Sequence, residues 1–204
     1  MTKINRQWLI DGRPTGRPLK DSDFKWAEAP VRDAEPGEVL LRTLYLGFDP
    51  AQKGWMENVG GYVAPTELGE VMRGSAIAEV VASKASGFKP GDKVTGRTGW
   101  QDYSTVPATD VLKIEDTKLL TAHLGVLGTT GMTAYFGLNK IGRPFAGDTL
   151  VVTGAAGATG SVVGQIGKIA GCRVIGVAGG ADKCNWLVSE LGFDAAIDYK
   201  SEDV

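Results

Sequence analysis

Cysteine and histidine are scarce in this chain of 204 residues, which holds two cysteines, Cys172 and Cys184, and one histidine, His123. These three residues are too few for a disulfide framework or for the usual Cys and His cage of a zinc ion. No apolar run approaches the length of a membrane-spanning helix. Met1–Ile10 has neither the apolar core nor the small-residue cleavage site of a secretory signal. We therefore expect a cytoplasmic protein.

Positive charge is also not in excess, because 22 Lys and Arg residues face 24 Asp and Glu residues, for a net charge of −2. This balance argues against nucleic-acid and anionic-membrane partners. The chain has no G-x-S-x-G sequence, which makes a hydrolase of that type improbable. It has no P-loop either, since Gly167-Lys168 is followed by Ile169 and lacks the upstream glycine.

Glycine, in contrast, is abundant: 29 of the 204 residues are glycine, about twice the usual share. Residues 1–122 read as β-rich, with turn signals between short strands, and predict a barrel-like β domain. Residues 123–204 read as alternating helices and strands, which predicts a parallel sheet. The strands that we expect in the first part are 7–10, 38–46, 75–82, one that follows the turn at 88–94, and 101–106. In the second part we expect helices at 129–140, 158–170 and 181–191 and strands at 148–153, 173–178 and 195–198.

The most informative segment is Asp148–Lys168, in which an apolar strand leads into Gly154, Gly157 and Gly160 and then into a helix. A strand, a tight glycine turn and a helix together place a pyrophosphate at the helix N-terminus. In the register of the G-x-G-x-x-G fingerprint, Gly157 lets the backbone approach the pyrophosphate and Gly160 lets the helix pack closely. The expected contacts are Ala156, Gly157, Ala158, Thr159 and Gly160. A glycine-rich turn without a ligand is the plainer alternative.

The end of the next strand helps to distinguish NAD from NADP. An NAD site usually has an Asp or Glu about 20 residues after the turn, but Val177-Ala178-Gly179-Gly180 contains no acid. Small residues leave room for a 2′-phosphate beside Gly179, and Lys183 follows three residues later. We therefore favour NADP(H), while Asp182 is a complication that we assign to the start of the helix.

Several sequence blocks resemble the medium-chain dehydrogenase/reductases, and within them the zinc-free alkenal and prostaglandin (leukotriene-type) double-bond reductases. The resemblance implies a GroES-like β-rich catalytic domain, of which residues 1–122 are the N-terminal part. It also implies a Rossmann domain, a doubly wound parallel sheet, of which residues 123–204 are the first half. The blocks are 44–50, 69–74, 88–94, 131–138, 154–165, 191–194 and 198–200.

The same resemblance implies NADPH and the reduction of the C=C bond of an α,β-unsaturated aldehyde or ketone. It implies that Lys183 and Tyr199 contact the adenosine 2′-phosphate and that Thr133 lies near the nicotinamide. Hydride transfer of this kind needs no metal, and we expect none. His123 is more consistent with a structural role than with a catalytic one.

One departure concerns the substrate site. Many members of the family have a tyrosine directly after the Asp-Pro pair, whereas this chain has Ala51. Substrate contacts then pass to Tyr62, or to Trp55 and Met56 as pocket walls, although ordinary packing explains the last two equally well. The catalytic residues themselves stay unassigned.

The chain supplies only the first three strands of a sheet with the order 3-2-1-4-5-6. We therefore expect a fragment with an open edge along its first strand, weak NADP(H) binding and little turnover. Quinone reduction within the same superfamily and a non-catalytic NADP-binding protein remain alternatives. The expected partner is a small molecule, an enone, enal or quinone, and similar proteins are often homodimers.

Overall fold

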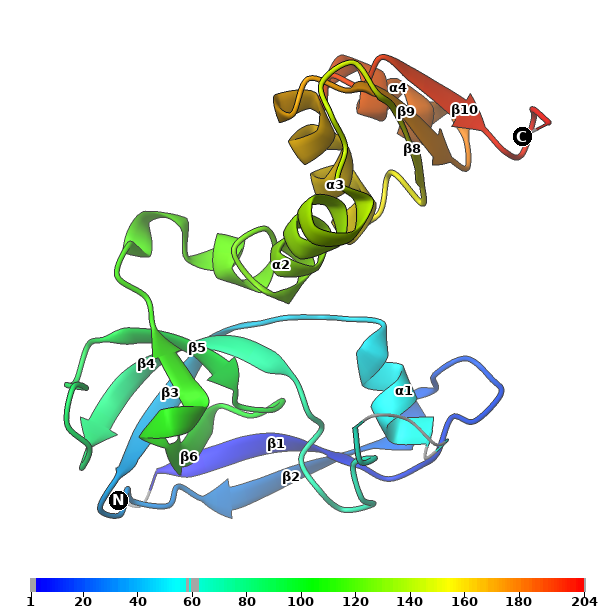
Figure 1. The fold of residues 1–204 in the computed structure, drawn as a ribbon. Coiled ribbons are helices and arrows are strands. Elements are labelled where there is room, and N and C mark those ends of the chain that lie inside the picture. The colour runs from blue at the N-terminus through cyan, green and yellow to red at the C-terminus, as the bar shows by residue number, and fades with distance from the viewer. Residues whose placement is uncertain (1–2, 58, 60–62, 204) are drawn as a thin grey trace. The chain divides into compact units, whose positions relative to one another are not determined.

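The computed structural model describes residues 3–57, 59 and 63–203. The chain divides into two compact units, Met1–Leu124 and Gly125–Val204 (Figure 1). The first unit is built from antiparallel strands and the second from a parallel sheet with helices. This is the predicted fold class, a β-rich half-barrel followed by a parallel α/β sheet.

The first unit contains a curled sheet of five antiparallel strands in the order β6-β3-β4-β5-β7 (Figure 1). The register between β3 and β4 shifts at Leu40/Leu41 and again at Thr43/Tyr45, and such irregularities bend and twist a sheet. A separate hairpin pairs β1 with β2. The bounds are β1 Ile4–Ile10, β2 Phe24–Pro30, β3 Glu38–Leu46, β4 Ser75–Ser83, β5 Lys93–Arg97, β6 Tyr103–Pro107, β7 Val111–Lys113 and one α-helix, α1 Ala51–Glu57, with 3-10 turns at Asp21–Asp23, Ala108–Asp110 and Thr117–Leu124.

Two groups of buried side chains hold this unit together. Inside the curled sheet, one face of the strands packs Val39, Leu41, Ala78, Val80, Val94 and Val111. Near the hairpin, Ile10, Met56 and Met72 form a second cluster, against which Phe24 and Trp100 pack. Consecutive residues are buried in both central strands, at 39–41 in β3 and at 76–78 in β4, so both faces of these strands are covered over part of their length.

Three elements of the first unit differ from the sequence-based expectation, because β2, α1 and β7 were not predicted. Charged residues interrupt the apolar positions of β2, which lies at the edge of a two-stranded hairpin. Helix α1 has Gly54 near its centre and spans only 7 residues. Strand β7 has 3 residues. Each is too short or too irregular to produce a clear periodic pattern.

The second unit is a three-stranded parallel sheet in the order β10-β9-β8. This confirms the predicted 3-2-1 arrangement, in which β8 lies at one edge. Val151 on β8 is 56% exposed, as expected of an open edge strand. The bounds are α2 Thr129–Phe136, β8 Thr149–Thr153, α3 Ala158–Ile169, β9 Arg173–Ala178, α4 Ala181–Ser189 and β10 Ala195–Asp198.

Glycines determine how closely α3 packs against the sheet. A Cβ atom on Gly164 would overlap the ring of Phe193, and one on Gly167 would come within 2.5 Å of Leu150 Cδ2. Close packing therefore accounts for Gly164 and Gly167, since glycine destabilises a helix interior relative to alanine. The sequence predicts an apolar face on this helix that consists of Val162, Val163, Ile166, Ile169 and Ala170, but Ile169 is 86% exposed.

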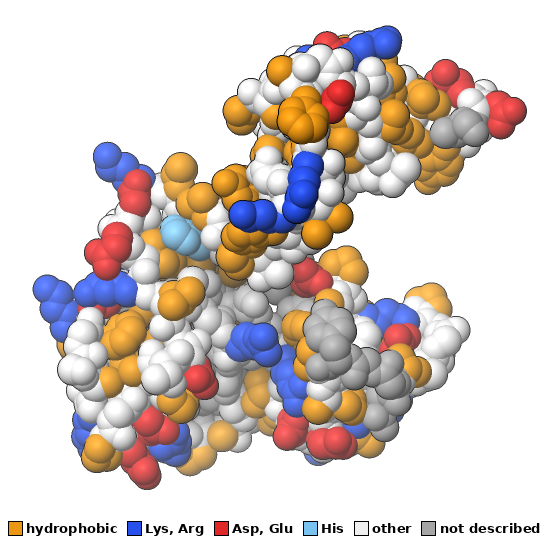
Figure 2. Space-filling model, viewed as in Figure 1, with side chains coloured by type: hydrophobic (Ala, Val, Ile, Leu, Met, Phe, Trp, Pro, Cys, Tyr) orange, Lys and Arg blue, Asp and Glu red, His pale blue; other side chains and the backbone are white. Residues whose placement is uncertain are grey.

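The segment predicted as one helix, 129–140, is divided. Helix α2 ends at Phe136, and Gly137–Gly142 continues as a π-helical turn that is closed by Arg143 in a left-handed conformation. The sequence places Met132, Tyr135, Phe136 and Ile141 close to an apolar stripe on this segment, but all four are more than half exposed. Hydrophobic side chains are visible on the surface of both units (Figure 2). Among the described helices of both units, none is long and apolar enough to cross a membrane.

Candidate functional site

The candidate site begins at the turn between β8 and α3. Gly154 has a φ angle of +60°, a conformation that glycine adopts without the steric cost of a Cβ atom. The N–H of Gly157 donates to Gly154 O at 2.9 Å, and the N–H of Ala155 donates to Val177 O at 3.1 Å. The second bond ties the turn to the neighbouring strand β9, so the turn is held at the carboxyl edge of the parallel sheet.

Gly160 allows the first turn of α3 to lie directly against this loop. A Cβ atom on Gly160 would overlap Gly154 O and would lie 2.9 Å from Ala155 Cα. Both of these are backbone atoms, which cannot rotate away as a flexible side chain can. The role predicted for the third fingerprint glycine, close approach of helix and turn, thus has a direct geometric basis.

The N-terminus of α3 is suited to an anion. Gly157, which precedes the helix, has no side chain that could cap it. The first turn of the helix contains no acidic residue. The first N–H groups of a helix lack partners within the helix, and the helix dipole places partial positive charge there. The N–H groups of Ala158, Thr159 and Gly160 are therefore available to a phosphate.

The second part of the site lies where β9 ends. Ala178 is buried, and Gly179 and Gly180 follow it before α4 begins at Ala181. A Cβ atom on Gly179 would lie 2.7 Å from the hydroxyl oxygen of Tyr199 and 3.0 Å from Lys200 Cε. The side chains of two residues that follow β10 thus occupy the place where an acidic side chain at position 179 would begin.

Asp198 connects the ends of β9 and β10. Its Oδ1 accepts the N–H of Gly180 at 2.8 Å and the N–H of Lys200 at 3.1 Å, while its own N–H donates to Glu202 Oε1 at 3.0 Å. The two backbone N–H groups hold the pKa of Asp198 below its usual value, because they stabilise the carboxylate form. The carboxylate therefore stays ionised and holds the two strand ends together.

The two remaining residues predicted for the cofactor are exposed. Lys183 lies in the first turn of α4, where its N–H donates to Gly180 O at 3.1 Å. Thr133 lies on α2, which packs against α3, and its hydroxyl donates to Thr129 O at 2.7 Å. The structure thus brings Gly179 and Tyr199 together and places Lys183 on the adjoining helix turn.

The predicted pocket residues of the first unit have different surroundings. Met56 is fully buried in the cluster with Ile10 and Met72, which is the ordinary packing that the sequence allowed. Trp55 is partly buried, and its carbonyl accepts the N–H of Thr66 at 2.9 Å. Tyr62 lies outside the described residues.

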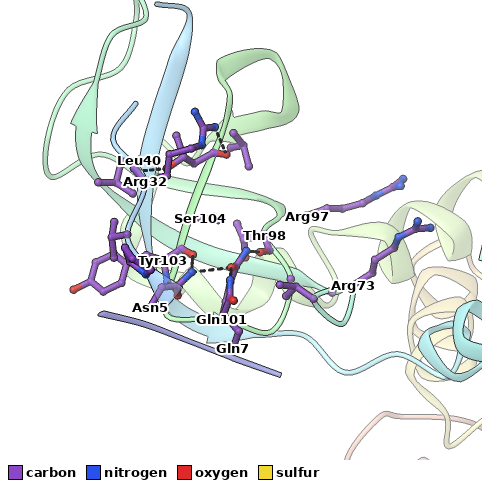
Figure 3. A pocket seen from close by; sticks show the side chains of 17 residues that line it. Asn5, Gln7, Arg32, Leu40, Arg73, Arg97, Thr98, Gln101, Tyr103 and Ser104 are labelled. Carbon is purple, nitrogen blue, oxygen red and sulfur yellow. Dashed lines mark hydrogen bonds between the residues drawn. The ribbon is translucent and has the colours of Figure 1, made fainter. Parts of the chain in front are cut away.

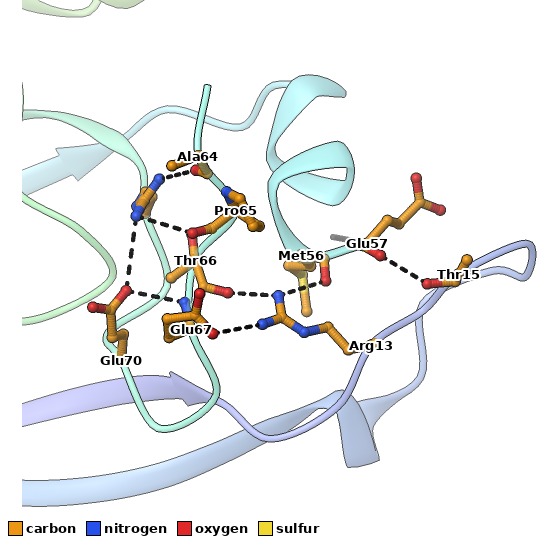
Figure 4. Close-up of polar contacts among 10 residues, drawn as sticks. Arg13, Thr15, Met56, Glu57, Ala64, Pro65, Thr66, Glu67 and Glu70 are labelled. Carbon is orange, nitrogen blue, oxygen red and sulfur yellow. Dashed lines mark hydrogen bonds and ion pairs between the residues drawn. The ribbon is translucent and has the colours of Figure 1, made fainter. Parts of the chain in front are cut away.

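Arg13 fixes the end of α1 against the segment 64–67 (Figure 4). Its Nη1 donates to Met56 O at 3.0 Å and to Thr66 O at 2.5 Å, and its Nη2 donates to Glu67 at 3.2 Å. Nothing in the local sequence pattern marked Arg13, because its partners lie more than 40 positions away along the chain. The bonds from Arg13 to Met56 O and Thr66 O fix the backbone next to Trp55.

A cavity of about 500 Å³ lies elsewhere in the first unit, and neither Trp55 nor Met56 lines it (Figure 3). The amide of Gln101 is at its centre: Gln101 Oε1 accepts from Asn5 at 2.9 Å and from Gln7 at 2.8 Å. These bonds connect β1 to the start of β6. The hydroxyls of Thr98 and Ser104 also belong to this wall, but their oxygen atoms are closed off from the open space.

In the described parts of the chain, no three His, Cys, Asp or Glu side chains gather closely enough to hold a metal ion. Sequence reasoning missed Asp198 and Lys200 as candidate site residues, although both belong to a block that it singled out. The pairing of Ala178 with Asp198 across β9 and β10 brings Asp198 and Lys200 to the end of β9. That pairing is a long-range contact, which a local pattern does not contain.

The antiparallel half-barrel, the parallel sheet and this turn form the N-terminal part of a medium-chain dehydrogenase/reductase fold. Residues 6–114 match the family model described as the N-terminal domain of oxidoreductase. The match covers more than half of the chain, and the chain therefore belongs to this family.

Two curated relatives and one solved structure illustrate the similarity. The chain is 44% identical to an NADPH-dependent curcumin reductase of Escherichia coli (strain K12), over 98% of this chain and 58% of the relative. It is 38% identical to a 2-alkenal reductase (NADP(+)-dependent) of Nicotiana tabacum, over 97% and 59%. The crystal structure of CurA in complex with NADPH from Vibrio vulnificus has a TM-score of 0.90 and 43% identity, over 97% and 59%. The chain thus spans less than two thirds of the length of these proteins.

Proposed function

We propose that the protein to which this chain belongs is a zinc-independent NADPH-dependent reductase of the C=C bond of α,β-unsaturated aldehydes or ketones. The observation that carries the proposal is the pair of features at the carboxyl edge of the parallel sheet. One is the open glycine turn at α3, and the other is the acid-free end of β9 with Tyr199 beside it. The names of the relatives, a curcumin reductase and a 2-alkenal reductase, support the substrate class.

The chain's residues would hold NADPH at its pyrophosphate and at its adenosine 2′-phosphate. The backbone N–H groups of Ala158, Thr159 and Gly160 would receive the pyrophosphate, and Ala156 and Gly157 would line its approach to the turn. Gly179, Lys183 and Tyr199 would receive the adenosine 2′-phosphate. Thr133 would lie toward the nicotinamide. When bound, the cofactor supplies the hydride that adds to the β-carbon of the substrate.

The preference for NADPH over NADH follows from what surrounds Gly179. An NAD site uses an acid to accept from the ribose 2′-hydroxyl, and a carboxylate at this place would repel a 2′-phosphate. Here the side chains nearest to Gly179 are the phenol of Tyr199 and the stem of Lys200, and a phenol hydroxyl and a lysine ammonium can both donate to a phosphate. Lys183 adds a positive charge on the adjoining turn.

Zinc independence is supported by the sequence itself. A zinc alcohol dehydrogenase needs Cys, His or acidic ligands in its first domain. Residues 1–122 of this chain have no cysteine and no histidine. The charge that develops on the substrate carbonyl would then need hydrogen-bond donors in place of a metal. Ala51 is not such a donor, so we propose Tyr62, with Trp55 as a supporting wall, whereas Met56 is fully buried in the core.

Titration of the 204-residue chain with NADPH and NADH, followed by fluorescence, tests the cofactor. We expect binding of NADPH, weaker binding of NADH, and a loss of this difference in Lys183→Gln. Lys140→Gln, an exposed lysine of the same unit that lies in the π-helical turn, is the control with the same change of charge. Equal affinity for both cofactors in the parent chain would contradict the proposal.

NADPH consumption with a panel of enals, enones and quinones tests the reaction. The assay compares this chain with a longer version extended to the length of its relatives. We expect turnover of enals and enones by the longer protein and little turnover by the 204-residue chain. Turnover of quinones alone would favour the quinone reductase alternative, and NADPH binding without any turnover by either protein would favour a binding protein.

A further inference from the structure

We propose that Lys200 is a second cation of the 2′-phosphate site and that Asp198 is the residue that positions it. This inference rests on the proposed function, because it concerns the same dinucleotide site. It adds a determinant of cofactor specificity that lies on the chain after β10, whereas Lys183 lies on α4.

The position of Lys200 is defined by its distance from Gly179. Its Cε lies 3.0 Å from the place of a Cβ atom on Gly179, and its ammonium is one bond beyond Cε. The side chain therefore extends across the end of β9, beside the hydroxyl of Tyr199. It is exposed, and it makes no ion pair with any residue that the structure describes. A free ammonium at this place is available to a ligand phosphate.

Asp198 determines this path through the backbone. Its Oδ1 accepts the N–H groups of Gly180 and Lys200 together, so the β9–α4 turn and the segment after β10 share one acceptor. The strand pairing of Ala178 with Asp198 places the carboxylate between them. Asp198 acts through these contacts, and we regard it as a positioning residue, since its own charge is directed to backbone donors.

The charged groups around this place have both signs. Lys183 and Asp182 come from the start of α4, and Lys200 and Glu202 follow β10. The two backbone bonds to Asp198, together with the Lys200 charge nearby, favour its ionised form. With that carboxylate already satisfied, the two lysines remain as donors for a phosphate. Charge-assisted hydrogen bonds of this kind are stronger than neutral ones.

The expected size of the Lys200 effect is moderate. A hydrogen bond to a charged group is stronger than one between neutral groups, but exposure to solvent reduces its contribution. We therefore expect removal of the ammonium to weaken binding of a 2′-phosphate about five- to tenfold. Binding of a nucleotide without that phosphate is expected to change less than about twofold. The effect should shrink at high salt, because exposed charges are screened.

The experiment titrates the 204-residue chain calorimetrically with two probes, adenosine 2′,5′-bisphosphate and adenosine 5′-monophosphate. Both occupy only the adenosine half of a dinucleotide site, so the test does not depend on turnover. The variants are Lys200→Gln, Lys200→Arg for rescue of the charge, and Lys140→Gln as the control for net charge. We expect Lys200→Gln alone to lose affinity for the bisphosphate and Lys200→Arg to recover most of it.

A double-mutant cycle tests the positioning role of Asp198. If Asp198 acts by placing Lys200, then Asp198→Ala lowers affinity for the bisphosphate in the parent and has little further effect in Lys200→Gln. Asp198→Asn, which keeps one acceptor oxygen, should retain part of the affinity. A merely structural role would weaken both probes equally and would add to the Lys200→Gln effect, and that result would overturn this part of the inference.

Failure of this inference can be told apart from failure of the proposed function. If the parent prefers the bisphosphate and Lys200→Gln behaves as the parent does, Lys200 is a solvated lysine and the proposed function stands. If the parent binds the two probes equally or binds neither, the NADPH assignment is refuted and the role of Lys200 is refuted with it.

Discussion

Replacing Gly164 by alanine tests the close contact between α3 and Phe193, the core residue that precedes β10. A Cβ atom at this buried position of α3 would lie within 2.7 Å of three ring atoms of Phe193. Carbon atoms in good contact lie about 3.5–4.0 Å apart. Phe193 is only 3% exposed and belongs to the core with Val174 and Leu187. The ring therefore cannot move aside without disturbing that core.

Two opposing terms determine the expected change in stability. Alanine is favoured over glycine inside a helix by about 1 kcal/mol. Overpacking a core typically costs about 1–3 kcal/mol, and displacing a phenylalanine from its site costs about 3 kcal/mol or more. The overlap here involves three ring atoms, so we place the cost at about 3 kcal/mol and the net loss of unfolding free energy at about 2 kcal/mol.

The cysteines of the chain provide a reporter for the second unit alone, because both lie after residue 124. Cys172 is buried, and its thiol is near Phe145 O, so it reacts with a thiol reagent only when the unit opens. In a Cys184→Ser background, labelling of Cys172 along a urea series gives the midpoint. With a slope of about 2 kcal/mol per molar urea, we expect a shift of about 1 M to lower urea.

Gly137→Ala is the matched control for this experiment. Gly137 lies in the same unit, has a helical backbone (φ −58°, ψ −48°), and has open space where its Cβ atom would be. We expect this variant to be as stable as the parent or slightly more stable. If Gly164→Ala were also neutral or stabilising, the close packing inferred between α3 and Phe193 would be refuted.

Two further predictions concern the glycine turn and the first unit. Gly160→Ala should lower NADPH affinity at least about tenfold, because its Cβ atom would overlap the backbone oxygen of Gly154; an unchanged affinity in a fluorescence titration would contradict this geometry. Asp23 is hydrogen-bonded by Arg17, which lowers its pKa to about 2. Its folded pKa is below the unfolded value of about 3.9, so its stabilising contribution is present above about pH 4 and is lost as the pH falls toward 2. Urea midpoints measured between pH 2 and 5 should therefore depend less on pH in Asp23→Asn than in the parent, whereas the exposed control Asp33→Asn should follow the parent.

The parallel sheet was predictable from the sequence because its strands are short runs of mostly apolar residues. Strands β9 and β10 match the predicted bounds, and β8 and α3 differ from them by one residue at one end. Such runs are bounded by glycines, which mark where each element must stop. In the first unit, β3 was also predicted to the residue, since the Pro36-Gly37 turn precedes a strongly apolar strand.

The elements that were missed depend on contacts distant in sequence. Strand β2 has a weak pattern of its own and is stabilised by its register with β1, in which Trp8 lies opposite Trp26. Their rings meet edge to face at 5.0 Å between centroids. Helix α1 is held by the contacts of Arg13 with Met56 O and of Thr66 N–H with Trp55 O. A window of ten residues contains none of these pairs.

The candidate site also depends on a contact between residues that are distant in sequence. The sequence shows that no acid stands at Gly179, and this alone only permits a 2′-phosphate. Which side chains lie where a Cβ atom on Gly179 would be depends on the register between β9 and β10, in which Ala178 lies opposite Asp198. That register brings Tyr199 and Lys200 to Gly179 and gives Asp198 the N–H of Gly180. A shift of the register by one residue would turn these side chains to the opposite face. The proposed preference for NADPH therefore depends as much on strand pairing as on the identity of any single residue.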